Sequence, residues 1–361
     1  MSRIVAAMSG GVDSSVAAAM LAEEARRTGV EVIGVWMRTH PDMGEGFEQK
    51  RSCCSPDALD DARRVAQLLG IPFFVLNLER EFGLRVIDTF ADAYLAGSTP
   101  NPCQACNQYI KFDELLRRGL AAYGADAVAT GHYARLSFDG GRWRLLRAAD
   151  ANKDQTYFLW VLSQEQLRHT RFPLGELTKP QVRARAEELT LPTAQKPESQ
   201  EICFVPLGDY RTLLEERRGY AGDPGPIVDA DGAMVGTHSG YAHYTVGQRH
   251  GLGVALGEAV YVREVRPERN EVVIGRRDEI AARSFVVDGR SFIAGEPPSE
   301  RFEASVRIRH RAPDVACEVT LIGDERFAVE TNEPVWAPAP GQAAVLYDGD
   351  ECLGGGRIAR A

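Results

Sequence analysis

The sequence has 361 residues, with 51 acidic and 42 basic side chains and a formal net charge of −9. Hydrophobic residues make up 44% and charged residues 26%, which is ordinary for a globular protein of two or three domains. No stretch approaches the roughly 20 continuous apolar residues of a bilayer helix, and the acidic balance argues against indiscriminate nucleic-acid binding.

The N-terminal segment and the cysteine content both predict a cytoplasmic protein. Glycines interrupt the N-terminal run MSRIVAAMSGG after a few apolar residues, so we expect no signal peptide. Seven cysteines are an odd number at low density, which argues against a secreted disulfide scaffold. We therefore expect reduced thiols that are available for chemistry, and no membrane partner.

The first half of the chain alternates short apolar runs with amphipathic stretches. The predicted strands span 4–7, 31–37, 73–78 and 127–130, and the predicted helices span 14–27, 55–69, 81–95 and 112–123. This alternation predicts an α/β domain, with a parallel sheet that helices cover on both faces.

The pattern changes after about residue 200, where short alternating runs separated by Gly, Pro and Asp predict small β-rich, barrel-like domains. These runs lie at 259–264, 271–274, 302–308, 317–321, 327–331 and 343–346. We divide the chain into an α/β domain (1–205), a central β-rich domain (206–282) and a C-terminal β-barrel-like domain (283–361).

A glycine- and serine-rich loop, MSGGVDSS, connects the first predicted strand to the first predicted helix. Its glycines allow close approach of a ligand to the backbone, and the helix N-terminus favours an anion. The loop lacks both the Gly-Lys-Ser/Thr ending of the P-loop and the spacing of the dinucleotide fingerprint. A generic turn, with Asp13 as a simple helix N-cap, is the alternative.

A C-x-x-C pair, Cys103 and Cys106, lies in a proline-rich loop just before a predicted helix. Thiolates at a helix start can act as nucleophiles or hold a soft metal, and no second C-x-x-C completes a zinc site. Cys203 lies about a hundred residues downstream. The other four are Cys53 and Cys54, which precede a helix, and Cys317 and Cys352, which we predict to be buried structural thiols.

Eight ordered blocks from about residue 3 to 358 resemble the bacterial tRNA-specific 2-thiouridylase family, whose members are N-type ATP pyrophosphatases. The resemblance implies an adenine nucleotide alpha hydrolase-like domain followed by two β-rich domains. The blocks are SGGVDSS, CCSPDALDDARRVAQLLGIP, NPCQACNQYIKF, ATGHYAR, KDQTYFL, KPESQEICFV, GYAHYTVGQRHGLG and CLGGGRI.

The resemblance implies a tRNA-uridine 2-sulfurtransferase that uses ATP and Mg²⁺ to adenylate the C2 oxygen of the wobble uridine in tRNAs for Lys, Glu and Gln. Sulfur then replaces that oxygen, with Cys106 as the nucleophile and Cys203 as the persulfide acceptor, and the resemblance implies a disulfide between the two after each turnover. The sulfur donor would be a cysteine desulfurase or a relay protein. The nucleotide site implied by the family comprises Ala7, Met8, Ser9, Gly10, Gly11, Val12, Asp13, Ser14, Met37 and Gly131.

Cys103 departs from the family pattern, in which an Asp is common at this position. With Cys106 and Cys203 it makes three thiols, so a [4Fe–4S] cluster with one open iron is an alternative to a persulfide relay.

The resemblance implies several tRNA contacts. Independently, a local basic cluster, Arg307, Arg309, His310 and Arg311, alternates along a predicted strand and its turn and is predicted to neutralise phosphates. Local alternatives are a solvated turn at 153–155, a hydrogen-bonded loop residue at 132 and a solvated strand face at 307–311. The chain has only five lysines, none after Lys196, so Arg supplies the later positive charge. The expected contacts are Asn101, Pro102, Cys103, His132, Lys153, Asp154, Gln155, Arg309, His310 and Gln342.

Two other functions fit parts of this pattern. One is another N-type ATP pyrophosphatase, either a 4-thiouridine synthase or an amide-forming synthetase, which would lack the pairing of NPCQAC with EICFV. The other is a non-catalytic RNA-binding protein that retains a vestigial nucleotide loop. Such a protein would bind tRNA without ATP turnover.

Overall fold

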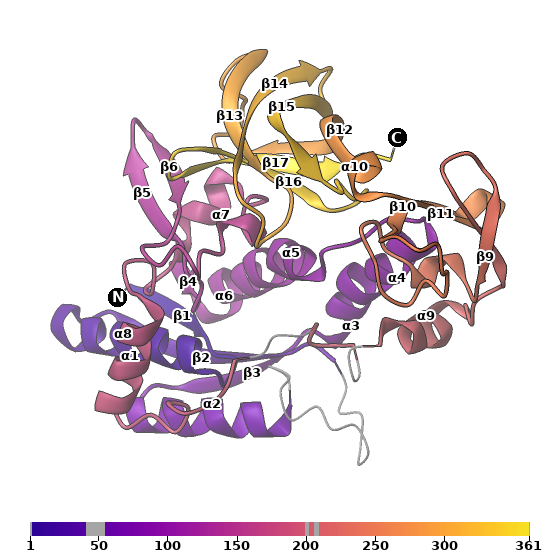
Figure 1. Cartoon of the computed structure of the whole chain (residues 1–361). Coiled ribbons are helices and arrows are strands. Elements are labelled where there is room, and N and C mark those ends of the chain that lie inside the picture. Colours follow the sequence, from indigo (N-terminus) through magenta and orange to yellow (C-terminus); the bar gives the residue numbers. More distant parts are fainter. Residues whose placement is uncertain (1, 41–54, 199–201, 206–208, 361) are drawn as a thin grey trace.

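The computed structural model describes residues 2–40, 55–198, 202–205 and 209–360. Its first half contains a five-stranded parallel sheet in the order β3-β2-β1-β4-β7 (Figure 1). The strands are β1 (Arg3–Ala7), β2 (Glu31–Arg38), β3 (Phe73–Asn77), β4 (Ala127–Ala129) and β7 (Thr170–Arg171). Cys53 and Cys54 lie outside the described residues. No helix in the described ranges is long and apolar enough to span a membrane.

Alternate residues of β1 face two separate hydrophobic cores, as expected for a strand that is covered on both sides. Ile4 and Ala6 pack in the core that includes α1 (Val12–Thr28) and α2 (Pro56–Leu69), whereas Val5 packs in a core with residues of α6 (Leu116–Tyr123). The predicted α/β domain with a doubly covered parallel sheet is therefore confirmed.

The predicted helices are present, and α1 begins at Val12, two residues earlier than expected. Two others are parts of longer continuous segments that also begin earlier. The first continuous segment comprises α3 (Glu79–Phe82), the π-helix η1 (Gly83–Ile87) and α4 (Asp88–Leu95). The second comprises α5 (Pro102–Ala105), the π-helix η2 (Cys106–Leu115) and α6, so it begins ten residues before the predicted start at 112. The C-x-x-C pair therefore lies inside the first turns of a helix rather than in the preceding loop.

Several short helices were not predicted. They are the α-helices α7 (Gln164–Arg168), α8 (Lys179–Glu188), α9 (Tyr210–Arg218) and α10 (Arg277–Ile280), and the 3-10 turns η3 (Thr156–Phe158), η5 (Tyr241–His243) and η6 (Pro267–Arg269). Among them, α8 matters most for the site described below because it packs beside α1.

Two β-structures follow the α/β domain, as predicted. The central sheet has the order β10-β11-β8-β9, with β8 (Gly225–Val228), β9 (Met234–His238), β10 (Tyr261–Arg266) and β11 (Glu271–Gly275). The C-terminal strands close into a six-stranded barrel because β12 pairs with both β15 and β17. They are β12 (Ala281–Phe292), β13 (Arg301–Arg307), β14 (Val315–Ile322), β15 (Arg326–Trp336), β16 (Ala343–Asp348) and β17 (Glu351–Ile358).

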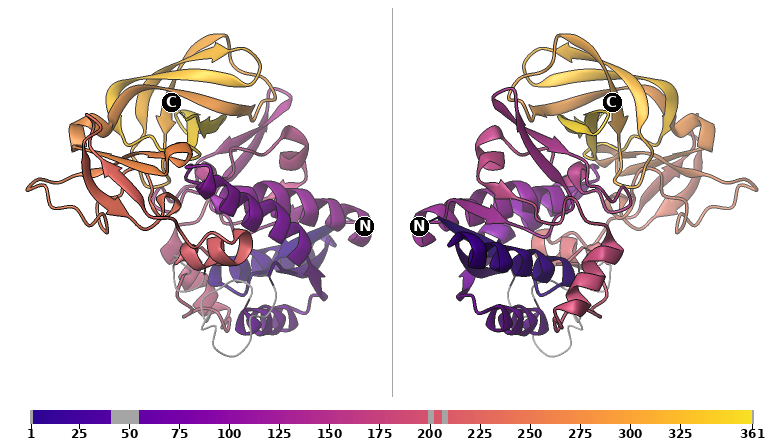
Figure 2. Two further views of the ribbon diagram at one scale, coloured as in Figure 1. Left: turned by 90° about the vertical axis from the view of Figure 1, so that its right-hand side faces the viewer. Right: turned by 90° about the vertical axis from the view of Figure 1, so that its left-hand side faces the viewer.

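The barrel is joined to the α/β domain by an unpredicted hairpin. Strands β5 (Arg135–Asp139) and β6 (Arg142–Leu146) extend the barrel sheet, with β6 pairing to β17. The barrel consequently sits over the helical segment α5–η2–α6 and opposite the parallel sheet (Figures 1 and 2). We propose 1–205, 206–282 and 283–361 as the three domains. By its hydrogen bonds, however, this hairpin belongs to the barrel.

Candidate functional site

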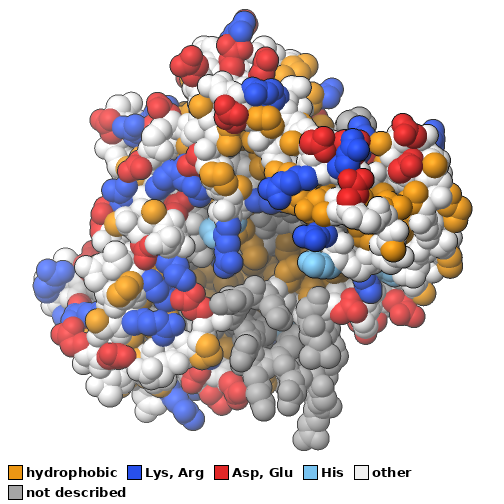
Figure 3. All heavy atoms as spheres, in the orientation of Figure 1, with side chains coloured by type: hydrophobic (Ala, Val, Ile, Leu, Met, Phe, Trp, Pro, Cys, Tyr) orange, Lys and Arg blue, Asp and Glu red, His pale blue; other side chains and the backbone are white. Residues whose placement is uncertain are grey.

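A cavity of about 640 Å³ lies between the carboxyl edge of the parallel sheet, the α5–η2 helix and the rim of the barrel. Lys and Arg side chains gather around the hollow between the α/β domain and the barrel (Figure 3). The cavity brings together most of the predicted site. The predicted residues in its lining are Met8, Ser9, Gly10, Gly11, Val12, Asp13, Ser14, Met37, Cys106, Lys153, Gln155, Cys203 and His310.

The loop between β1 and α1 forms one wall of this cavity. Its backbone is shaped by the hydroxyl of Ser14, which accepts from Ser9 N at 3.1 Å and donates to Gly11 O at 3.1 Å. Gly10 has a φ of 70°, and a Cβ there would lie 2.1 Å from Ala58 O, so only glycine fits. Gly11 is the N-cap of α1 and has no side chain to occupy the helix N-terminus. The amide groups of this turn are therefore oriented for an anion.

Asp13 is not the N-cap of α1, so this alternative for the residue is wrong. It lies in the first turn, where its carboxylate accepts from Lys179 Nζ at 2.7 and 2.9 Å and from Tyr133 Oη at 2.8 Å. Burial and the negative charge of Asp13 together raise the pKa of Tyr133, which therefore remains a hydrogen-bond donor. These contacts fix the carboxylate at the entrance of the anion site.

A chain of opposite charges continues along the cavity wall from Asp13. Lys179 also pairs with Glu198 at 2.8 Å, and Glu198 in turn accepts from Lys153 at 2.7 Å. Lys196 donates to Gly10 O at 2.9 Å and to Asp61 at 2.7 Å, which ties the glycine loop to α2. Carboxylates therefore hold the ammonium groups of these lysines in place around the cavity.

Sequence reasoning missed Lys111, Lys179 and Lys196, although the lysine count contained a usable signal. Four of the five lysines line this one cavity, and the fifth, Lys50, lies outside the described residues. Arginine supplies most of the other positive charge, so the compact ammonium charges of the four described lysines are concentrated around this one cavity.

The two cysteines expected to react, Cys106 and Cys203, line the same cavity and pack against one hydrophobic cluster that contains Phe82 and Phe204. Cys103 is exposed and does not line the cavity. No group of three or more His, Cys, Asp or Glu side chains in the described ranges is arranged to hold a metal ion. Cys317 and Cys352 are buried in the barrel, as predicted, and burial raises the pKa of Cys317 to about 12.

Apart from the exposed Cys103, the residues expected to contact tRNA fall into two groups. Lys153, Gln155 and His310 line the cavity, where Gln155 Oε1 also accepts from Tyr133 N at 2.9 Å. The others support the surrounding framework. Asn101 caps the cysteine helix through Gln104 N, and Pro102 is buried in its first turn.

Four of these supporting residues have well-defined protein partners. Gln342 donates to Thr99 O at 3.0 Å and so links the barrel to the loop before the cysteines. Arg309 donates to Ala337 O at 2.8 Å and lies over the Trp336 ring. His132 and Asp154 are buried, with 8% and 2% of their surfaces exposed. Their side chains therefore face protein groups rather than an open surface.

Ala7 and Gly131 flank the nucleotide loop without lining the cavity. Ala7 is the last residue of β1, and Gly131 follows β4. A Cβ at Gly131 would lie 2.8 Å from both Asp13 C and Ser14 N. Gly131 therefore lets the end of β4 pack directly against the N-terminus of α1.

The arrangement defines a HUP-type protein with two added β-domains, and three family models agree with this class. The tRNA methyl transferase HUP domain matches residues 2–207, the tRNA methyl transferase PRC-barrel domain 211–276, and the Aminomethyltransferase beta-barrel domain 282–358. A NAD⁺ synthetase from Burkholderia pseudomallei aligns with 62% of this chain and 76% of its own, at 17% identity and a TM-score of 0.32, which is too low to support an argument.

Full-length relatives identify the family more closely than the domain descriptions do. The tRNA-specific 2-thiouridylase MnmA of Carboxydothermus hydrogenoformans is 51% identical over 99% of this chain and 97% of its own. The proteins of the same name from Geotalea uraniireducens and Chloroflexus aggregans are 50% and 48% identical, covering 99% and 100% of this chain and 95% and 99% of their own. The chain belongs to the tRNA-specific 2-thiouridylase family, a family of tRNA-uridine 2-sulfurtransferases.

Proposed function

We propose that this protein uses ATP to replace the C2 oxygen of the wobble uridine with sulfur, in tRNAs for Lys, Glu and Gln and in the cytoplasm. The observation that carries the proposal is the single cavity, which an anion-binding loop, four lysines and the two cysteines Cys106 and Cys203 line together. An activated phosphate ester and a sulfur nucleophile have to meet for this reaction, and such a cavity allows them to meet.

In the first step, the uridine C2 oxygen attacks the α-phosphorus of ATP. The bond to the β-phosphate oxygen breaks, and pyrophosphate leaves with the electron pair while the uridine N3 proton is lost. The amides of residues 9–14 would hold the pyrophosphate portion, together with the ammonium groups of Lys179 and Lys196. Asp13 and Ser14 offer the hard oxygen donors that suit Mg²⁺, which would neutralise phosphate charge when bound with ATP.

In the second step, the terminal sulfur of a persulfide on Cys203 attacks C2, and the C2–O bond breaks to release AMP. The Cys106 thiolate then attacks the sulfur of Cys203, which releases the thiocarbonyl and leaves a Cys106–Cys203 disulfide for a thiol reductant. A cysteine desulfurase or a relay protein would reload Cys203. Both cysteines line the cavity, which supports the participation of both in the sulfur transfer.

The iron–sulfur alternative does not fit the described residues. A [4Fe–4S] cluster needs its cysteine ligands gathered around one point, and Cys103 is exposed outside the cavity that Cys106 and Cys203 line. No metal-holding group of three side chains exists in the described ranges. The proposed mechanism therefore contains no step on an iron–sulfur cluster.

The proposal is tested by incubating the protein with ATP, Mg²⁺, a sulfur donor and unmodified tRNA, followed by nucleoside analysis. We expect 2-thiouridine at the wobble position, with AMP and pyrophosphate formed in equal amounts, and its loss in Cys106→Ser and in Cys203→Ser. Cys317→Ser, at a buried thiol of the barrel, is the matched control. Undiminished 2-thiouridine in Cys106→Ser would contradict the mechanism. Formation of 4-thiouridine, or AMP release that depends on a small amine, would identify another N-type ATP pyrophosphatase instead.

A further inference from the structure

Lys111 differs from the other lysines of the cavity in its partner. The ammonium groups of Lys153, Lys179 and Lys196 each form an ion pair with a carboxylate at 2.7 Å. Lys111 instead contacts Nε2 of His132 at 3.3 Å, and no carboxylate in the described ranges pairs with it. Among the described residues, no carboxylate therefore neutralises its positive charge in the cavity.

The π-helix η2 (Cys106–Leu115) places Lys111 on the cavity together with Cys106. Five residues span about 1.4 turns of an α-helix, so side chains that far apart point in different directions. In a π-helix the hydrogen bonds join residues five apart, and residues 106 and 111 are therefore about one turn apart on one face. An ordinary α-helix here would turn one of the two side chains away.

His132 positions the ammonium group of Lys111 through a direct contact. Burial and the charge of Lys111 keep the pKa of His132 well below its ordinary value, so the ring is neutral. Lys111 Nζ then donates to Nε2, and Nδ1 donates to Thr130 Oγ1 at 2.7 Å. His132 follows Gly131, which packs against the backbone of Ser14 at the anion-binding end of α1. This connection links Lys111, through His132 and Gly131, to the nucleotide loop that lines the same cavity.

We propose that Lys111 is a catalytic cation that contacts the phosphoryl group of the uridine adenylate, with His132 as its positioning residue. The proposal rests on the proposed function. When sulfur forms its bond to C2, the C2–O bond breaks and the oxygen leaves as part of AMP with the electron pair. The ammonium of Lys111 would stabilise the negative charge that develops on that phosphate. Lys111 is neither consumed nor oxidised in this step.

The test is a single-turnover assay of 2-thiouridine formation with excess enzyme, saturating ATP and a defined persulfide load. Removing one preorganised donor at a developing anion costs about 100-fold in rate, so we expect that loss in Lys111→Met. We expect partial recovery in Lys111→Arg, and ATP and tRNA dissociation constants within about threefold of wild type. Arg117→Met removes an exposed cation from the same helical segment and is the matched control.

A double-mutant cycle separates a positioning role of His132 from a merely structural one. His132→Ala should slow the reaction less than Lys111→Met, and the double variant should be no slower than Lys111→Met alone. A rate in Lys111→Met close to that of wild type would overturn the inference, as would multiplied losses in the double variant. If wild-type protein makes no 2-thiouridine, the proposed function itself fails, and the two failures are therefore distinguishable.

Discussion

At the scale of single residues, the site combines a set of paired charges with two thiols that line the same cavity. Asp13, Lys179, Glu198 and Lys153 form an alternating row of carboxylates and ammonium groups along one wall. Each charge in the row has a partner, so the row holds its geometry without a ligand. An incoming phosphate would therefore meet cations that are already positioned.

Glu198 makes this row sensitive to acid. Burial acts to raise the pKa of Glu198, but hydrogen bonds from Lys153 and Lys179 outweigh burial and lower the pKa from 4.5 to about 2. A carboxylate whose pKa is depressed on folding stabilises the protein above its unfolded pKa and loses that contribution as the pH falls. The stabilisation is thus complete above about pH 4.5 and disappears as the pH approaches 2.

We expect Glu198→Gln to lower the free energy of unfolding by about 1–2 kcal/mol at pH 7, after discounting for partial solvent exposure. The difference from wild type should shrink between pH 4.5 and 2, which urea unfolding at several pH values can follow. Glu188→Gln, at an exposed carboxylate of α8, serves as the control. A difference that does not change with pH would contradict the assignment.

The sequence allowed much of this site to be predicted, because its central motifs are local. The glycine loop can be recognised from a strand, a turn and a helix start that are adjacent in the sequence. The two cysteine motifs can be recognised from their own residues. Lys179 lies 166 residues from Asp13, and nothing in its own neighbourhood indicates that the two meet. The burial of Asp154 depends likewise on Arg307, which the barrel supplies from a distant part of the chain.

At the scale of elements, close packing at strand ends determines the shape of the nucleotide loop. Gly131 sits where β4 ends, against the first turn of α1, and Gly10 sits against Ala58 of α2. Backbone atoms of neighbouring elements therefore pack directly against these two glycines and leave no room for a side chain at either position.

Gly131→Ala should therefore impair nucleotide use. The added Cβ would lie 2.8 Å from Asp13 C and Ser14 N, so the start of α1 has to shift. We expect the KM for ATP to rise at least about tenfold, because displacements of about 1 Å in a binding site are costly. Gly83→Ala is the matched control, since its Cβ would meet only the flexible end of Arg217 at 3.4 Å. A KM within twofold of wild type would show that the loop tolerates the shift.

Prediction of elements succeeded where the pattern was local and failed where pairing was distant. Four of the five parallel strands and four of the six barrel strands were predicted from their apolar runs, whereas β7, β12 and β17 were not. The β5–β6 hairpin was missed because its place is set by β17, about 200 residues later. The helix at 102 was missed because its prolines were interpreted as a loop, although Asn101 followed by Pro102 is also a typical N-cap and first-turn pair.

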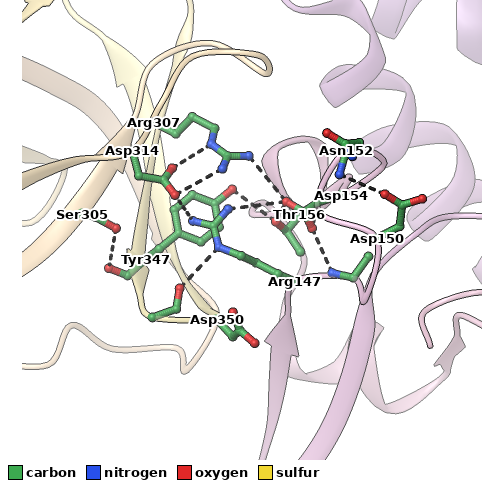
Figure 4. Close-up of polar contacts among 12 residues, drawn as sticks. Arg147, Asp150, Asn152, Asp154, Thr156, Ser305, Arg307, Asp314, Tyr347 and Asp350 are labelled. Atoms are coloured by element: carbon green, nitrogen blue, oxygen red, sulfur yellow. Dashed lines mark hydrogen bonds and ion pairs between the residues drawn. The ribbon is translucent and has the colours of Figure 1, made fainter. Parts of the chain in front are cut away.

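At the scale of the whole molecule, a buried charge network fastens the barrel to the cavity wall. Asp154 lies 3.6 Å from both Arg147 and Arg307, and both arginines also bind Asp314 (Figure 4). Arg307 and Asp314 belong to the barrel side, whereas Asp154 belongs to the segment that carries Lys153 and Gln155 into the cavity. The barrel therefore sets the position of two cavity residues without lining much of the cavity itself.

This arrangement changes the role that is expected of the arginines in the barrel. Arg307 and Arg309 belong to a cluster predicted to neutralise phosphates, yet Arg307 is engaged by carboxylates and Arg309 by Ala337 and Trp336. His310 and Arg311 are the members that reach the cavity. We therefore expect the barrel to contribute to tRNA binding partly through the segment that it holds in place.

We expect Asp154→Asn to lower the free energy of unfolding by about 2–4 kcal/mol, because it leaves two largely buried guanidinium groups with one carboxylate instead of two. The same change should raise the KM for tRNA more than the KM for ATP, since Lys153 and Gln155 lose their support. Asp350→Asn is the control, because Asp350 is exposed and pairs with Arg135 at the surface, where a loss below about 1 kcal/mol is expected. Urea unfolding and steady-state kinetics on both variants check the two parts separately. If Asp154→Asn shifted the two KM values equally, the barrel would be stabilising the fold without positioning the tRNA-facing segment.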